Sequence, residues 1–307
     1  MLKKLFYTTA ILVGVLLFSA CSGNSGKTNK TESDDFTLDE AALNQDAPLE
    51  LSEEIIGDVI QNISSPVEMA ALIKKSGVDF SQKILNKPER ISDYNTSFKR
   101  ALNLGVFSAD LGYINTFDKN TIVISYLLGI KELAEGIKVG QFFDFNSLKQ
   151  IATNSNNLDS LMEISVNSFN KMDSYLREQN RSNVSTLIVT GAWIEGLYIA
   201  GSVIKETKDS ELINRIGEQK DIIDILLIIL NNYSADPNFA EMVTRMEQIK
   251  QAYAGVKITT EFGEPKRIER EGTLVIVQDE ISHVEITPEQ IDAIVTEIAN
   301  LRDFIVL

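Results

Sequence analysis

From Leu51 onward, apolar residues return along the chain at intervals of three and four positions. The first such stretch contains Leu51, Ile55, Ile56, Val59, Ile60 and Ile63. This spacing places the apolar side chains on one face of an α-helix. The same spacing predicts further helices, so that the expected set covers residues 52–63, 66–76, 97–117, 119–138, 145–153, 157–180, 183–206, 210–233, 237–253 and 288–304. The fold is therefore predicted to be mainly α, with packed antiparallel helix pairs in a bundle or a short helical-repeat array.

Several of these helices have recognisable start signals. In Ser65-Pro66-Val67-Glu68, Ser65 can cap the helix, Pro66 suits the first helical position, and Glu68 completes a capping box. Asp236-Pro237 and Thr287-Pro288 repeat the pattern.

The exception to the helical pattern is residues 256–287. Every second residue from Val256 to Phe262 is apolar or threonine, which is typical of a half-buried strand. The β-branched stretch 273–277 is expected to pair with 283–286, and the basic cluster Lys266, Arg267 and Arg270 to lie in a solvated turn. We expect a small β hairpin or extended arm, with an irregular loop as the alternative.

The first residues of the chain have the pattern of an export signal. Lys3 and Lys4 precede an apolar run from Leu5 to Phe18, and Ser19-Ala20-Cys21 follows. Cys21 is the one cysteine of the chain. This mainly apolar run of 14 residues is shorter than the ~20 needed to span a bilayer as a helix.

This segment resembles the lipobox of bacterial lipoproteins, except that Phe18 stands where leucine is usual. The resemblance covers residues 1–21. It implies cleavage before Cys21, a thioether-linked diacylglycerol on its sulfur, and an amide-linked chain such as palmitate on its new amino group. Such chains would anchor the protein, because stable anchoring takes at least two. An ordinary secretory signal or an uncleaved anchor is the alternative.

The predicted organisation is a signal peptide over 1–20, a lipidated cysteine and flexible tether over 21–50, and a helical domain over 51–307. The tether begins Gly/Ser-rich and becomes acidic, a composition that disfavours a packed core. Residue 22 is Ser rather than Asp. By resemblance to Gram-negative sorting rules, this favours the outer membrane, facing the periplasm; in a Gram-positive cell the anchor would be in the plasma membrane.

Charge and composition exclude several classes of function. The formal net charge is −15, and loss of Lys3 and Lys4 with the leader makes it −17. This acidity argues against nucleic acid as a partner. His283 is the one histidine, so zinc or copper sites with several His and Cys ligands cannot form within one chain. No nucleotide-binding glycine motif and no G-x-S-x-G elbow is present, and we predict no cofactor.

Two nearly charge-free helical segments each contain a single acid. Asp110 is the one charge between Arg100 and Asp118, and Glu195 is the one charge between Arg181 and Lys205. Each segment has glycines and leads into a second helix. We therefore expect an internal duplication of a helical hairpin, 97–138 and 183–233, with coincidence as the alternative.

A helix that is apolar nearly all round belongs in the centre of a fold. We therefore interpret 183–204 as a buried central helix rather than a membrane span. Each acid is followed three residues later by a tyrosine on the same helix face, Tyr113 and Tyr198.

These acids have two interpretations. In the first they are structural, and Asp110 and Glu195 hydrogen-bond to Tyr, Ser/Thr or backbone N–H groups. In the second they line a candidate small-molecule pocket between the repeats. The predicted pocket residues are Asp110, Tyr113, Trp193, Glu195 and Tyr198.

The leading hypothesis is a non-enzymatic, membrane-anchored envelope lipoprotein that binds a partner protein or small ligand. It resembles uncharacterised, mainly helical envelope lipoproteins. The alternatives are a carboxylate-dependent hydrolase of envelope glycans, with Asp110 and Glu195 as acid and base, and a structural spacer. The hydrolase needs two carboxyl groups ~5–9.5 Å apart in an open cleft.

Overall fold

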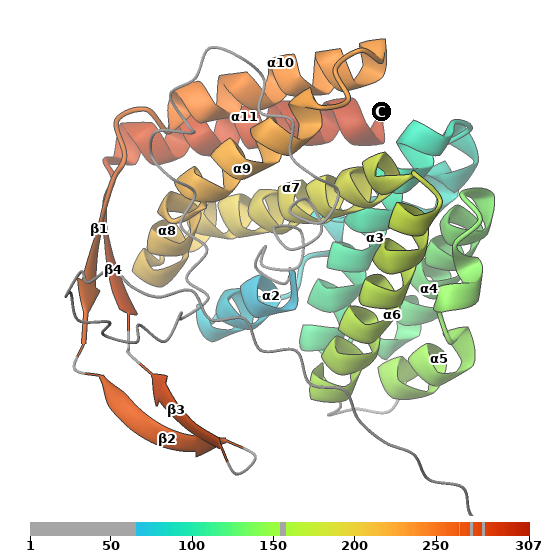
Figure 1. Cartoon of the computed structure of the whole chain (residues 1–307), viewed down its shortest axis with the longest axis horizontal. Coiled ribbons are helices and arrows are strands. Elements are labelled where there is room, and N and C mark those ends of the chain that lie inside the picture. Colours follow the sequence, from blue (N-terminus) through green and yellow to red (C-terminus); the bar gives the residue numbers. More distant parts are fainter. Residues whose placement is uncertain (1–65, 154–157, 264, 271–272, 278–279) are drawn as a thin grey trace, which may run out of the picture. The chain divides into compact units, whose positions relative to one another are not determined.

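A computed structural model describes residues 66–153, 158–263, 265–270, 273–277 and 280–307, all within the unit Gln45–Leu307 (Figure 1). The predicted leader, Cys21, the tether and the helix expected over 52–63 lie outside the described residues.

The described chain is mainly α-helical and its helices pack in pairs, which confirms the predicted fold class. The α-helices agree with the predicted ranges to within about two residues, except that the predicted range 210–233 is divided into two helices. They are α2 (Pro66–Lys75), α3 (Ser97–Thr116), α4 (Asn120–Gly136), α5 (Phe145–Thr153), α6 (Leu158–Glu178), α7 (Ser182–Thr207), α8 (Ser210–Gly217), α9 (Gln219–Asn231), α10 (Pro237–Ala252) and α11 (Pro288–Val306). Short 3₁₀ helices are η1 (Gln82–Ile84), η2 (Pro88–Asp93) and η3 (Gly140–Phe142).

The predicted caps of the later helices form as expected. The Asp236 side chain accepts a hydrogen bond from the backbone N–H of Asn238 at the start of α10. Thr287 and Gln290 make a reciprocal capping box at the start of α11. These local hydrogen bonds satisfy backbone donors that the helix itself leaves unpaired, which fixes where each helix begins.

The prediction of one continuous helix over 210–233 is wrong, because the chain bends between α8 and α9. The bend lies at Gly217 and Glu218. Val284 packs against Gly217 where a Cβ would otherwise lie. Because Gly217 has no Cβ, the side chain of Val284, from a strand distant in sequence, can occupy this space.

Helices α3 and α7 form the centre of the fold. They contact each other extensively, while α4 and α2 pack against α3, and α2, α6, α9 and α11 pack against α7. Glu195 and most other residues of α7 are buried. Within the described residues α7 is the helix long and apolar enough to cross a membrane, but 78% of its most apolar stretch is buried inside the protein. The prediction of a buried central helix is thus confirmed.

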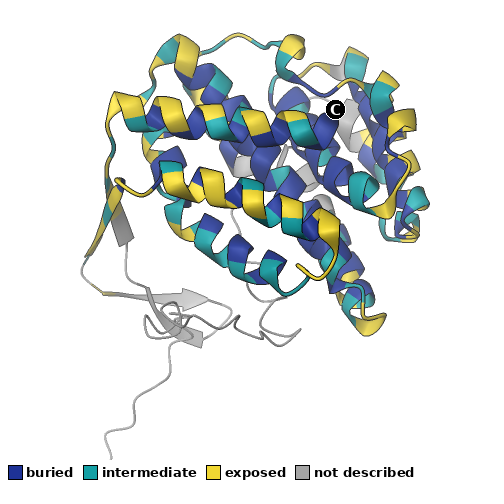
Figure 2. Cartoon of the chain, turned by 90° about the horizontal axis from the view of Figure 1, so that it is seen from above, coloured by how far each residue is buried: buried dark blue, intermediate teal, exposed yellow. Residues whose placement is uncertain are grey.

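The remaining helices cover this central pair. α10 packs between α9 and α11, and α4 contacts α5. Figure 2 shows buried residues on the inward helix faces and exposed residues on the outward faces. One-sided burial of this kind is the consequence of the three-and-four spacing of apolar residues.

A two-stranded antiparallel ribbon joins α10 to α11 (Figure 1). Strand β1 (Lys257–Phe262) pairs with β4 (Glu280–Glu285), and β2 (Lys266–Arg270) pairs with β3 (Thr273–Val277). The predicted β element near 256–287 is confirmed, but two details are corrected. His283 lies opposite Thr259 of β1 rather than in a strand paired with 273–277, and the basic cluster lies in strand β2 rather than in a turn. The β2–β3 pair thus lies between β1 and β4 in the sequence, and both pairs are antiparallel.

Candidate functional site

The site lies where the backbones of α3 and α7 are in close contact. A Cβ on Gly105 of α3 would overlap the carbonyl oxygen of Ile188 in α7. Reciprocally, a Cβ on Gly191 of α7 would overlap the carbonyl oxygen of Leu102 in α3. Each glycine thus removes a side chain that would hold the helices apart.

This close approach puts Asp110 and Glu195 side by side. Asp110 lies five residues after Gly105, and Glu195 lies four residues after Gly191. Both side chains have 0% of their surface exposed, and their carboxyl groups hydrogen-bond to each other. The two acids that the sequence singles out therefore belong to one buried site.

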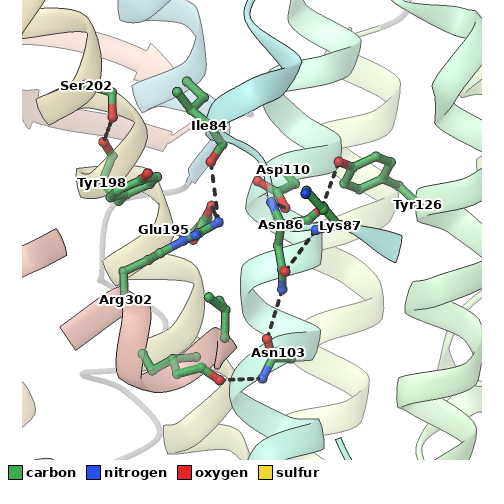
Figure 3. A network of polar contacts seen from close by, with 12 residues as sticks. Ile84, Asn86, Lys87, Asn103, Asp110, Tyr126, Glu195, Tyr198, Ser202 and Arg302 are labelled. Carbon is green, nitrogen blue, oxygen red and sulfur yellow. Dashed lines mark hydrogen bonds and ion pairs between the residues drawn. The ribbon is translucent and has the colours of Figure 1, made fainter. Parts of the chain in front are cut away.

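Arg302 of α11 neutralises Glu195 (Figure 3). Its Nε donates to Glu195 Oε2 at 3.0 Å, and its Nη2 donates to Oε1 at 3.2 Å. Nη2 also donates to the carbonyl oxygen of Ile84 at 3.4 Å, and the guanidinium lies 4.5 Å from the ring centroid of Tyr198. A forked pair of this kind is among the strongest side-chain interactions, provided that its remaining polar atoms are satisfied.

Asp110 has no comparable cation. Its Oδ2 accepts a hydrogen bond from the backbone N–H of Asn86 at 3.1 Å, and its Oδ1 accepts none from a nitrogen or hydroxyl donor. Burial, followed by the adjacent Glu195 carboxylate, raises the pKa of Asp110 well above its usual range. Burial also raises the pKa of Glu195, but the Arg302 guanidinium opposes that rise. The pKa of Asp110 is therefore raised further than that of Glu195, because Asp110 lacks a paired cation.

Asn86 connects the acids to the rest of the core. Its Nδ2 donates to the Tyr94 hydroxyl at 3.0 Å and to Asn103 Oδ1 at 3.1 Å, and its carbonyl accepts from the Tyr126 hydroxyl at 2.8 Å. Figure 3 shows Asn86 between Asp110, Asn103 and Tyr126. Burial is the main cause that raises the pKa of Tyr126 above its usual range. Tyr126 thus remains a neutral donor.

The other two predicted pocket residues make their hydrogen bonds elsewhere. The Tyr113 hydroxyl accepts from the backbone N–H of Ser81 at 3.1 Å, and its ring stacks on Phe80 at 5.3 Å. Trp193 Nε1 donates to Gln219 Oε1 at 2.8 Å. The structure therefore brings Asp110, Glu195 and Tyr198 together around Arg302, and gives Tyr113 and Trp193 separate partners.

Sequence patterns did not reveal Asn86, Asn103 or Arg302. A signal for Arg302 exists, because it lies four residues after Ile298 and three before Ile305, on the apolar face of α11. A charged residue at such a position indicates a buried partner of opposite charge. For Asn86, in the irregular stretch before η2, no periodic signal applies.

The arrangement can hold a proton and a fixed network of hydrogen bonds. In the described part of the chain, no group of three or more His, Cys, Asp or Glu is placed to hold a metal ion. Both carboxyl groups are sealed from solvent, whereas acid and base catalysis on a glycan requires them in an open cleft.

Comparison of this chain with models of known protein families, with curated proteins and with solved structures finds no match.

Proposed function

We propose that this chain is the precursor of a lipid-anchored envelope protein whose helical domain is a non-enzymatic interaction module. The observation that carries the proposal is the leader that ends at Cys21, with two lysines, an apolar run of 14 residues and small residues before the cysteine. Two or more acyl chains on Cys21 would give stable attachment.

The packing of α7 supports a single attachment through Cys21. Among the described residues, α7 is long and apolar enough to cross a membrane. It packs instead against α3, α6, α9 and α11. Insertion into a bilayer would strip Glu195 of Arg302 and Gly191 of its contact with α3. The free energy of those contacts favours the folded domain.

The sealed polar core argues against Asp110 and Glu195 as a catalytic acid and base. Asp110 and Glu195 satisfy each other with Arg302 and Asn86, and neither reaches solvent. A protein partner is favoured over a small ligand, because the ribbon of β1–β4 has two strands and, among the described residues, no third strand pairs with its edges. An exposed edge can accept a strand of another protein.

The experiment that tests the anchor is expression of wild type and Cys21→Ser with a labelled fatty acid. Wild type should carry the label and sediment with membranes, whereas Cys21→Ser should be unlabelled and soluble. Circular dichroism of the soluble variant should show a helical protein with cooperative unfolding. Membrane retention of Cys21→Ser would contradict the proposed single attachment.

A further inference from the structure

The buried site has more negative groups than positive ones. Two carboxyl groups, Asp110 and Glu195, are buried there with one guanidinium, that of Arg302, which pairs with Glu195. Arg302 is the one buried cation among the described residues. Two ionised carboxylates would leave one negative charge without a partner in the core, which is far more costly than retaining a proton.

The groups that surround the pair supply no second positive charge. From the segment before α3 come Asn86 and Tyr94, from α3 Asn103, from α4 Tyr126, and from α7 Tyr198. The more distant charges that act on these groups are Asp303, Glu89, Arg90 and Asp93. Of these, Arg90 is the one cation, and its interactions are with Asp93 and the carbonyl oxygen of Leu307.

The same network holds the last turn of α11. Asn103 Nδ2 donates to the carbonyl oxygen of Ile305 at 3.0 Å, and the Tyr94 hydroxyl donates to that of Val306 at 3.2 Å. Carbonyls in the last turn of a helix have no partner within it, so these side chains act as a cap. Both caps are bonded to Asn86, which in turn bonds Asp110.

We propose that the folded protein retains one proton on Asp110 and that this proton keeps α11 docked on α3 and α7. With the proton present, Asp110 donates to Glu195, and Glu195 is free to hold Arg302. Without it, two carboxylates face each other around one guanidinium, and the bond between them is lost. Repulsion between the two carboxylates then weakens the Glu195–Arg302 pair. It also displaces Asn86, and with it the side chains that cap the carbonyls of Ile305 and Val306.

The sign of the pH dependence follows from the raised pKa of Asp110 in the folded chain. Its stabilising effect is fully present below the pKa of the unfolded chain, about 4 for aspartate. It declines above that value and is lost as pH rises through the folded pKa. Over this window the unfolding equilibrium constant of wild type should rise tenfold per pH unit relative to a variant that cannot ionise there.

The test compares full-length wild type, Asp110→Asn and Asp118→Asn in detergent, by urea unfolding from pH 5 to pH 9. Asn keeps the shape of protonated aspartate and donates from its amide. Asp118→Asn is the matched control, because Asp118 follows the same helix but is exposed at the surface and pairs with Lys74. Asp110→Asn should diverge from wild type by tenfold per pH unit, and Asp118→Asn should run parallel to wild type.

Two further measurements use wild type alone and do not depend on the folding of Asp110→Asn. Infrared spectra of wild type at neutral pH should show the C=O stretch of a protonated carboxylic acid, which alkaline titration removes. Hydrogen exchange should show that amides of α11 lose protection at alkaline pH before those of α9. Absence of the infrared band, parallel curves for wild type and Asp110→Asn, or equal protection of α11 and α9 would each overturn the proposal.

Discussion

Arg302 donates two hydrogen bonds to Glu195, at 3.0 and 3.2 Å, across 107 residues of sequence. The pair joins α11 to the middle of α7. Its burial makes the ionic contact sensitive to every change in local charge, because the interior screens charges far less than water does.

Removing the cation should be strongly destabilising. Arg302→Met leaves Glu195 without a partner, and breaking a buried pair from one side costs about 3–5 kcal/mol. Urea unfolding at neutral pH measures this loss. Arg215→Met is the control, because Arg215 pairs with Glu218 at the surface, where such pairs contribute less than about 1 kcal/mol. Equal losses for the two variants would contradict a buried role for Arg302.

Replacing Glu195 or Asp110 by its amide should change the free energy of unfolding by different amounts. Glu195→Gln removes the carboxylate that holds Arg302, so we expect a loss of ~3 kcal/mol at neutral pH. Asp110→Asn replaces an acid that is already protonated, so we expect a loss below ~1 kcal/mol. Thermal unfolding of both variants at pH 7 checks the order. A larger loss in Asp110→Asn would place the proton on Glu195 instead.

One added methyl group at the crossing of α3 and α7 should destabilise the protein. Gly105→Ala and Gly191→Ala each place a Cβ against backbone that cannot move aside without separating the helices. Overpacking of this kind costs about 1–3 kcal/mol or more. Denaturant unfolding measures the loss.

Gly196→Ala is the matched control, because no heavy atom lies within 4 Å of the Cβ position at Gly196. Alanine has the higher helix propensity, so this variant should be neutral or more stable by up to ~1 kcal/mol. Destabilisation of Gly196→Ala to the level of Gly105→Ala would show that the crossing is not the cause.

The single tryptophan should report on the same core. Trp193 is 5% exposed and bonded to Gln219, so its emission should be that of a buried indole and shift to longer wavelength on unfolding. Gln219→Met leaves the indole N–H unsatisfied, at a cost of about 1–3 kcal/mol. Trp193→Phe combined with Gln219→Met should recover part of this loss. Full additivity of the two changes would contradict the hydrogen bond.

The internal duplication of 97–138 and 183–233 stays a prediction. The reciprocal glycine contacts are consistent with it, since Gly105 and Gly191 each lie against the other helix. However, the first range contains α3 and α4, whereas the second is divided into α7, α8 and α9.

Local signals were sufficient for the helices. The bounds of α5 and the capping box of α11 depend on residues that are near in sequence, so periodicity and cap residues locate them. The bend at Gly217 escaped prediction, because the contact that requires a glycine there is made by Val284, which lies in a strand far along the chain.

The sequence by itself determined that Asp110 and Glu195 would be buried, because each is the one charge in an apolar helix. It also predicts a leader that ends at Cys21. Only the tertiary structure decided that the two acids share a single site and that Arg302 neutralises one of them. Helical periodicity fixes which face of a helix is buried, but it contains no information about which distant helix face lies opposite. Two glycines set the distance between α3 and α7, and the packing of α11 brings the one cation that the site contains.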